Sequence, residues 1–327
     1  MTQQSLEDVM SCIIECIKTV GRGERGRKPL SFEQAKQVMD DYLDGQVGDD
    51  QMAMLLMLIR VQNETNAEIA GFVKAFQSRV PDLGADIDWP CYAGKRNDKS
   101  SGKPWHLIAA KILADNGYKV LMHGYMDKPS GREHAQMYLD AVNICCADSP
   151  QHANELLKQQ GIAYLPLANF APQAQTMIGW KARYGLRTPI NTVVRALNPG
   201  GAKLGLRGSF HPGFQQLHAE VENVIGDKSH SVVSFKGQSG ESEYNPKVSQ
   251  TVWMSTPDSV QSFYWPEMML SDIALPKLCI LGTPEAEWNL MANTIVDTMT
   301  AILFTQYHVR DDAYAIAIRY WQDYCCQ

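Results

Sequence analysis

The sequence predicts an α/β protein in which a small all-helical N-terminal domain precedes a larger α/β domain with a mostly parallel central sheet. Apolar residues recur at helical spacing through the first 80 residues, whereas short β-type runs alternate with helical segments from about residue 86. A chain of 327 residues that is 45% hydrophobic is also long enough to bury a substantial core. We predict a helical domain over residues 1–80, joined by an insertion near 170–195, and an α/β domain over residues 81–327.

Four helices are expected in the N-terminal domain. The apolar repeat of the first one ends at Gly21, and Ser31 is a good N-cap with Gln34 at the capping-box position. That second helix should run to about Leu43. The third is apolar on nearly all sides, which predicts a buried helix. The third and fourth helices are expected over residues 51–62 and 66–80.

The rest of the chain alternates strands and helices, a pattern typical of a parallel sheet covered by helices. The expected strands cover residues 87–93, 118–124, 162–168, 230–237 and 249–254. The expected helices cover residues 105–117, 132–143, 151–161, 172–197, 286–305 and 311–324.

Charge and cysteine content narrow the class of protein. The formal charge of −6 argues against a protein that coats nucleic acid with its whole surface, although a local basic patch remains compatible with it. The eight cysteines contain no CxxC motif, which argues against structural zinc and favours a reducing compartment. We find no signal peptide and no apolar run that spans a membrane, so a cytoplasmic protein is expected.

A basic, glycine-containing loop, CYAGKRNDKSSGKPWHL, follows the first expected strand and precedes a helix that should open at Pro104. Turns of this kind offer backbone N–H groups to anions. The loop is not a Walker A motif, because Asn97 occupies its first glycine position. A solvated basic loop explains the composition equally well. The candidate phosphate-binding residues are Gly94, Lys95, Arg96, Lys99, Ser101 and Lys103.

Two further motifs suggest ligand contacts. His123 and Gly124 follow an apolar strand, at the end where α/β folds bind ligands, although a lone histidine there is more often structural. Lys181, Arg183 and Arg187 lie close together in sequence and are able to face one anionic group. Surface charge at a helix end explains these three equally well.

Two charged segments have alternative interpretations. Glu241 and Glu243 are suited to a hard cation such as Mg²⁺, but an exposed acidic turn is the commoner explanation and the one we favour. The basic segment GRGERGRK suits nucleic-acid phosphates, and solvated linkers have the same composition. Its cations are Arg22, Arg25, Arg27 and Lys28.

Several stretches together resemble the anthranilate phosphoribosyltransferase family. They are YLDGQVGDDQMAMLLMLIRVQNETNAEIAGFVKAF at 42–76, the His-Gly pair after a strand, FAP at 170–172, GLRTPINTVVRALNP at 185–199 and LGLRGSFHPGF at 204–214. The similarity covers nearly the whole chain in order. It implies the glycosyltransferase fold shared with pyrimidine nucleoside phosphorylases, a homodimer, Mg²⁺, and phosphoribosyl pyrophosphate or another phosphate ligand.

The site motifs of that family are changed in this chain. Its GTGGD loop, followed by TFNIS, is replaced here by YAGKRNDKSSGKPWHL, and its KHGN by the four residues that start at Met122. Its metal-binding Asp-Glu pair falls on Ser242 and Glu243, which implies that half of a magnesium site is missing. The arginine that meets the acceptor's carboxylate falls on Lys181, which keeps the charge but loses the bidentate fork.

The resemblance implies two alternative functions. The first is a glycosyltransferase of the tryptophan-biosynthesis type, which transfers a phosphoribosyl group to an aromatic acceptor such as anthranilate. Gly94, Ser101, His123 and Gly124 would hold the phosphates, Lys181 and Arg187 the acceptor, and Glu243 a residual Mg²⁺.

The second function is that of a divergent branch of the family, a non-enzymatic homodimer that binds DNA or RNA through GRGERGRK and the cations of the basic loop. For either function we expect the double substitution Lys95→Ala/Arg96→Ala to weaken anion binding and leave the fold intact, because loop residues carry little packing.

Overall fold

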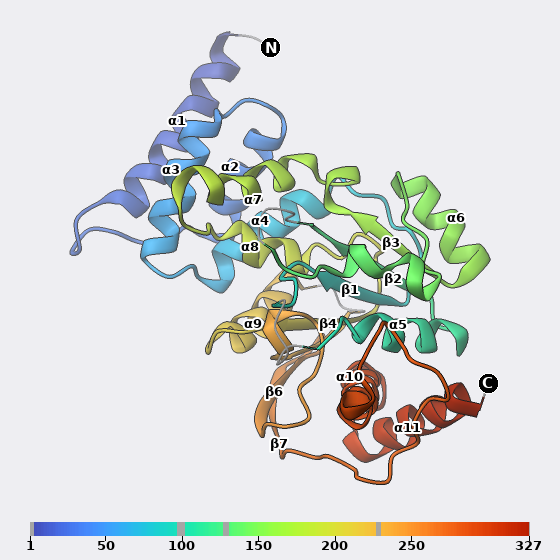
Figure 1. Ribbon diagram of the computed structural model, residues 1–327. Coiled ribbons are helices and arrows are strands. Elements are labelled where there is room, and N and C mark those ends of the chain that lie inside the picture. The colour runs from blue at the N-terminus through green and yellow to red at the C-terminus, as the bar shows by residue number, and fades with distance from the viewer. Residues whose placement is uncertain (1–2, 97–101, 127–130, 227–229, 327) are drawn as a thin grey trace.

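The computed structural model describes residues 3–96, 102–126, 131–226 and 230–326. A bundle of helices lies at one end of the molecule, a sheet in the middle, and α10 and α11 at the other end (Figure 1). This arrangement confirms the predicted fold class, a helical N-terminal part followed by an α/β part with a mostly parallel sheet.

The N-terminal helices are α1 (Gln3–Gly21), α2 (Phe32–Leu43), α3 (Asp49–Val61) and α4 (Asn66–Gln77). The predicted capping box at the start of α2 is confirmed: the Gln34 N–H donates to Ser31 Oγ, and the Ser31 N–H donates to Gln34 Oε1. Two later helices, α7 (Pro172–Tyr184) and the short α8 (Ile190–Val193), share one apolar cluster with them. We therefore propose that residues 1–80 and 170–195 form one domain and that the remainder of 81–327 forms the other.

The sheet has seven strands in the order β3-β2-β1-β4-β5-β6-β7. Strands β1 to β5 are parallel, and β6 and β7 are added antiparallel at one edge. The strand bounds are β1 Ile87–Cys91, β2 Val120–Gly124, β3 Ile162–Pro166, β4 Leu204–Ser209, β5 Ser231–Lys236, β6 Gln250–Ser255 and β7 Val260–Trp265.

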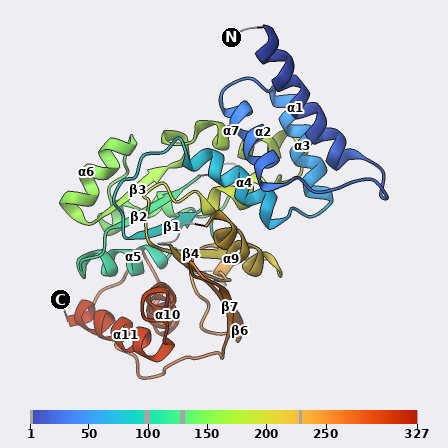
Figure 2. The same ribbon diagram turned by 180° about the vertical axis from the view of Figure 1, so that it is seen from behind.

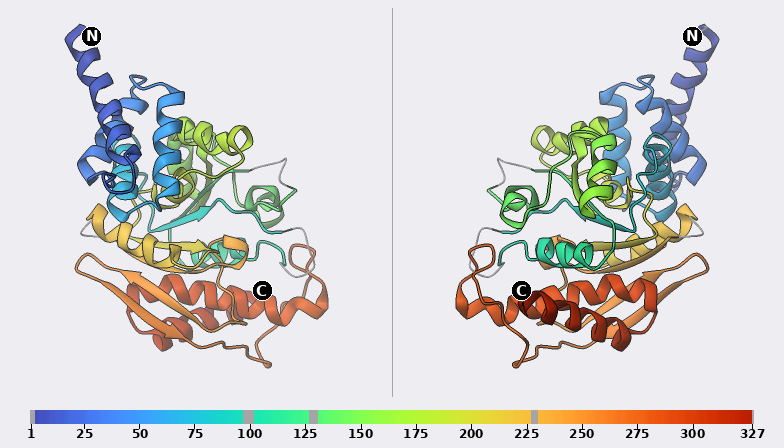
Figure 3. Two further views of the ribbon diagram at one scale, coloured as in Figure 1. Left: turned by 90° about the vertical axis from the view of Figure 1, so that its left-hand side faces the viewer. Right: turned by 90° about the vertical axis from the view of Figure 1, so that its right-hand side faces the viewer.

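Helices cover both faces of the sheet. Successive side chains of a strand point to opposite faces, so one strand packs against both layers of helices. In β2, Val120 and Met122 pack in the cluster that contains α5, α10 and α11, whereas Leu121 packs in the cluster that contains α6. Figures 2 and 3 show α10 and α11 together against one side of the sheet. The helix bounds are α5 His106–Asp115, α6 Pro150–Gln160, α9 Phe214–Ile225, α10 Trp288–Tyr307 and α11 Arg310–Cys326.

Some expected elements were wrong. Residues 132–143 form two short 3₁₀ turns, Ala135–Tyr138 and Asp140–Val142, in place of one helix. The helix expected over 172–197 is interrupted at Gly185, whose φ of +74° ends α7. Helix α5 begins two residues after Pro104. Strands β4 and β7 and helix α9 were not predicted at all.

Strand β4 was missed because it carries a charged residue in its middle. Arg207 is fully buried, and its guanidinium forms ion pairs of 2.7 Å with Asp88 Oδ2 on β1 and with Glu222 Oε1 on α9. Burial raises the pKa of Asp88, but the charges of Arg207 and His123 outweigh it and hold that pKa below its usual value. This layer of paired charges fixes α9 against β1 and β4. Within the described ranges, no helix has the length and apolar character that crossing a membrane requires.

Candidate anion-binding site

A cavity of about 530 Å³ lies where the carboxyl ends of the parallel strands meet the helical bundle. Ala93 follows β1, Ser209 ends β4 and Lys236 ends β5, so three strand ends contribute to its floor. Helix α3 and the segment around α8 form the opposite wall. Crevices at the carboxyl ends of strands are the usual ligand sites of open α/β sheets.

The lining of this cavity is strongly cationic. Among the residues that the structure describes, it contains six Lys and Arg side chains and a single carboxylate, that of Glu64. Arg60 forms an ion pair with Glu64, with 3.1 Å between Nη1 and Oε2, so one cation is neutralised locally. The cationic lining residues are Arg60, Arg96, Arg132, Arg187, Arg195 and Lys236. Such a concentration of positive charge favours a ligand that carries several negative charges.

Arg195 is the most constrained of these cations. Burial lowers its pKa, Glu241 opposes that shift, and Arg187 lowers the pKa further by charge repulsion. Its Nη1 donates to the main-chain oxygen of Asn191, one turn earlier. A bound anion would relieve the repulsion between the two guanidiniums. His218, also on the wall, has its pKa lowered well below the usual value by burial and then by Arg195 and Arg207, and is therefore neutral near pH 7.

One wall of the cavity is aromatic. Phe210 lies after β4, and the Lys236 ammonium is 5.9 Å from the centre of its ring. Phe214 is the first residue of α9, and the Arg60 guanidinium is 5.7 Å from its ring. A flat ring packed here would have cations within reach of its substituents. Because α9 starts at the cavity, the positive end of its dipole adds to the favourable field for an anion.

The loop after β1 places only part of the predicted phosphate-binding set at this cavity. Arg96 is exposed and lines it. Gly94 has a φ of +63°, and its N–H donates to Glu241 Oε1, so this backbone group is already engaged. Lys99 and Ser101 lie outside the described residues.

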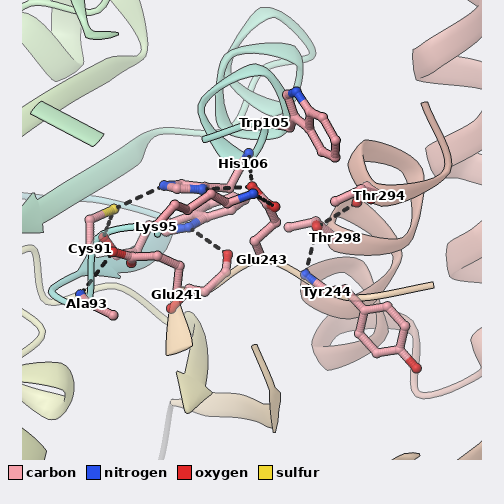
Figure 4. A network of polar contacts seen from close by, with 12 residues as sticks. Cys91, Ala93, Lys95, Trp105, His106, Glu241, Glu243, Tyr244, Thr294 and Thr298 are labelled. Atoms are coloured by element: carbon pink, nitrogen blue, oxygen red, sulfur yellow. Dashed lines mark hydrogen bonds and ion pairs between the residues drawn. The ribbon is translucent and has the colours of Figure 1, made fainter. Parts of the chain in front are cut away.

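Lys95 corrects an expectation. Its side chain is fully buried, forms an ion pair with Glu243 Oε1, and places its ammonium 4.9 Å from the centre of the Trp105 ring (Figure 4). A lysine in this position is part of the packed interior. The expectation that Lys95→Ala leaves the fold intact is therefore not supported by the structure.

Glu243 was a candidate Mg²⁺ ligand, and the donor set around it does not fit that ion. Its Oε1 pairs with Lys95, and its Oε2 accepts from the His106 N–H at 2.8 Å and contacts His106 Nδ1 at 3.0 Å. Both oxygens are thus engaged, and an ammonium lies beside them. Mg²⁺ demands near-octahedral oxygen coordination and would be repelled by that ammonium. Ser242 Oγ accepts from the Gly208 N–H.

His123 and Gly124 lie in the core of the sheet. The His123 imidazole is fully buried, with Nδ1 2.7 Å from Tyr92 Oη and Nε2 3.0 Å from Asp88 Oδ1. Gly124 packs so closely on β1 that a Cβ atom would overlap the Cys91 carbonyl. Among the described residues these two are absent from the cavity lining, so the structural interpretation of the histidine fits better.

Of the remaining predicted cations, one lines the cavity and the others lie elsewhere in the structure. Arg187 lines the cavity, whereas Lys181 lies on the exposed side of α7, away from the described lining. Lys103 Nζ lies 2.8 Å from Glu133 Oε1 and 3.2 Å from Tyr138 Oη. The basic segment between α1 and α2 is exposed throughout. Its cations are Arg22, Arg25, Arg27 and Lys28.

Sequence reasoning missed most of the cavity. Arg195 lies inside the helix expected over residues 172–197. Arg60 lies in the helix expected over residues 51–62, whose apolar pattern predicts burial. His211 and Phe214 belong to the SFHPGF segment at the end of β4, which carries part of the family resemblance. The one available signal was the presence of cations in helices that are otherwise apolar.

Comparison with known proteins supports the family. Residues 14–80 match the model of the glycosyl transferase family, helical bundle domain. An anthranilate phosphoribosyltransferase from Geobacillus stearothermophilus is 28% identical over 214 residues, which is 65% of this chain and 62% of that protein. One from Aquifex aeolicus is 24% identical over 261 residues, which is 78% of this chain and 73% of that protein.

Solved structures share the fold. Anthranilate phosphoribosyltransferase from Thermus thermophilus superposes with a TM-score of 0.72 at 19% identity, over 95% of this chain and 94% of that one. The enzyme from Saccharomyces cerevisiae, in complex with PRPP and Mg, gives a TM-score of 0.64 at 15% identity, over 96% and 97% of the two chains.

In sequence, the chain spans about three fifths (62%) of the length of the Geobacillus relative. The relatives are anthranilate phosphoribosyltransferases, the helical bundle matches a glycosyl transferase model, and the α/β fold is the one seen in the solved enzymes. In sequence and in fold, this chain is thus similar to anthranilate phosphoribosyltransferases.

Proposed function

We propose that the cavity binds a multiply charged phosphate ester of the phosphoribosyl pyrophosphate type, and that the protein transfers the phosphoribosyl group to a small aromatic acceptor. The observation that carries the proposal is the described part of the lining, which sets six cations against one carboxylate around about 530 Å³. A pyrophosphate and a 5′-phosphate together carry enough negative charge to balance such a lining.

In the proposed reaction an aromatic amine attacks C1′ of the ribose. The new C1′–N bond forms while the C1′–O bond to pyrophosphate breaks, the pyrophosphate leaves with the electron pair, and the amine releases its proton to water. The leaving group gains charge in the transition state, and cations fixed in advance stabilise that charge. Arg187, Arg195 and Arg96 are the cavity arginines suited to this task.

The acceptor would lie against the aromatic wall. Phe210 and Phe214 offer ring surfaces, and Lys236 beside Phe210 suits a carboxylate on the acceptor. Anthranilate has this combination of a flat ring, an amine and a carboxylate. Because neither oxygen of Glu243 is free, no step is assigned to Mg²⁺ held by that residue.

Loss of anthranilate fluorescence in the presence of phosphoribosyl pyrophosphate tests this proposal. We expect turnover by the native chain and at least a tenfold loss for Arg195→Ala, since one removed charge-assisted contact is worth about 1.5–3 kcal/mol. Lys158→Ala, an exposed charge loss on α6, is the matched control and should leave the rate unchanged. Binding of the phosphate ester without turnover, with any aromatic amine acceptor, would contradict transfer and leave only the binding site.

Lys181→Ala decides whether the acceptor contact inferred from the resemblance exists. Its exposed position on α7 predicts unchanged kinetics. A raised KM for the acceptor alone would show that α7 approaches the substrate in the working protein.

A second candidate function is nucleic-acid binding, and the exposed connection between α1 and α2 favours it. The four cations of that connection are solvent-exposed, namely Arg22, Arg25, Arg27 and Lys28. Binding to a labelled oligonucleotide should weaken steeply with salt, and Arg25→Ala/Arg27→Ala should reduce the salt slope. An equal slope for the variant would exclude this segment as the contact. A homodimer, also expected from the resemblance, is tested by light scattering of the same sample.

A further inference from the structure

Three groups with the chemistry of metal ligands meet under the floor of the cavity, outside the proposed substrate contacts. They are the Cys91 thiol at the end of β1, the His106 imidazole at the start of α5, and the Glu241 carboxylate between β5 and β6. One ligand atom of each lies within 4.8 Å of the others, and all three residues are buried. We propose that these residues form a buried site for one divalent ion of the zinc class.

The histidine is prepared for a metal. His106 Nδ1 lies 3.0 Å from Glu243 Oε2, and a carboxylate accepts only, so Nδ1 carries the proton. The lone pair is then on Nε2, which faces Cys91 Sγ at 3.8 Å (Figure 4). A carboxylate that holds the far nitrogen of a histidine is the usual support for a zinc ligand, because it fixes both the tautomer and the ring.

The geometry suits zinc. Sulfur and nitrogen ligands of a tetrahedral zinc ion lie about 3.6 Å apart, as follows from bonds of about 2.3 and 2.05 Å. The separation of 3.8 Å between Cys91 Sγ and His106 Nε2 is close to that value. Thiolate, imidazole and carboxylate together select a borderline-soft ion over Mg²⁺ or Ca²⁺. Three protein ligands leave the fourth position for a water molecule.

A second, independent observation comes from Glu241. Its side chain is 2% exposed, and Oε1 accepts from the Ala93 N–H at 2.9 Å and from the Gly94 N–H. The other oxygen, Oε2, is buried without a hydrogen-bond partner. An unpaired buried carboxylate oxygen is costly, and a cation beside it would remove that cost. Arg195 contributes a longer-range positive field, and no hydrogen bond or ion pair connects it to Glu241 in the described structure.

No sequence motif indicates this site, because its three ligands come from separate segments and no CxxC is present. A bound ion would join β1, α5 and the segment after β5 at one point. It would thereby hold the turn that carries Ala93 and Arg96 at the cavity.

Titration of the metal-stripped full-length chain with Co²⁺ tests the site. We expect a sulfur-to-cobalt charge-transfer band in the near ultraviolet that saturates at one equivalent per chain. Cys91→Ser should abolish the band, whereas Cys146→Ser, which alters an exposed cysteine, should leave it unchanged. No band in the native chain, or an equal band in Cys91→Ser, would overturn the proposal; the latter would assign the ion to surface cysteines.

Zn²⁺ affinity, measured by competition with a chromophoric chelator, provides a second test that does not depend on the thiol variant folding. Glu241→Gln should weaken binding by more than the roughly 10–100-fold typical of losing an outer-sphere partner. Zn²⁺ should also raise the midpoint of thermal unfolding of the native chain, and do so less for Glu241→Gln. Equal affinities for the two proteins would remove Glu241 from the ligand set and contradict the site.

Discussion

Replacing Lys95 by methionine should destabilise the protein strongly, although the lysine lies in a loop. Its ammonium and the Glu243 carboxylate are both fully buried and paired. Removal of one partner from a buried pair leaves an uncompensated charge and costs about 3–5 kcal/mol. Glu243 would keep two donors from His106, so we expect the lower end, about 3 kcal/mol. Methionine keeps the length of the stem, so the change isolates the charge.

Two variants make this measurement specific. Lys103→Met removes the partner of Glu133, but that lysine is about one third exposed, so a loss below about 1 kcal/mol is expected. The double variant Lys95→Met/Glu243→Gln removes both charges and should recover most of the stability lost by Lys95→Met. Replacing both members of a buried pair is often close to neutral.

Urea unfolding followed by tryptophan fluorescence and by far-ultraviolet circular dichroism gives these free energies, if the two probes agree. A difference below about 0.5 kcal/mol between the native chain and Lys95→Met would refute the reasoning. The pH dependence gives a further check. The pKa of Glu243 is lowered in the folded state by Lys95 and His106 against the effect of burial, so its contribution is present above about pH 4.5 and lost as pH falls through the folded pKa.

Three other expectations follow from buried or crowded groups. Burial raises the pKa of Asp297 to about 7, so the folded state keeps a proton that the unfolded state releases, and stability falls as pH rises from about 4 to 7. Asp297→Asn should remove that fall and raise the free energy of urea unfolding at pH 8 by up to about 4 kcal/mol. Parallel pH profiles of stability for the variant and the native chain would contradict this. Gly237→Ala should lower the free energy of unfolding by more than about 2 kcal/mol, because the new Cβ would overlap the Glu241 carbonyl. Gly179→Ala, which has open space around it in α7, should be neutral or stabilising. Equal unfolding midpoints for the two variants would disprove this. Arg195→Ala should weaken pyrophosphate binding at least tenfold in calorimetry, as loss of one charge-assisted contact requires, and Lys158→Ala should not.

Sequence patterns predicted the elements that local chemistry determines. The start of α2 follows from Ser31 and Gln34. The side chain of each residue accepts a hydrogen bond from the backbone N–H of the other, without help from the rest of the chain. Strand β4 depends on tertiary partners. Arg207 is acceptable in its middle only because Asp88 and Glu222, far away in sequence, neutralise it. The pattern of polar and apolar residues around Arg207 does not reveal these long-range ion pairs.

The candidate site shows the same limit. A lysine in a basic loop is normally solvated, so Lys95 looked like a surface cation, and only the fold brings Glu243 to it. Conversely, Arg195 looked like one charge on a helix until the structure placed it beside Arg187 in a cavity. The cavity takes its cations from several distant segments. The topology of the fold brings these cations together, and their spacing along the chain does not indicate it.

The central claim is that the cavity binds a polyanionic phosphate ester through its own cations, without Mg²⁺ held by Glu243. Calorimetric titration of the native chain with phosphoribosyl pyrophosphate, in EDTA and again with Mg²⁺, tests it most directly. The account predicts saturable binding at one site per chain, with affinities in the two conditions that agree within about tenfold. Binding that appears only with Mg²⁺, or no binding by the folded protein, would contradict it.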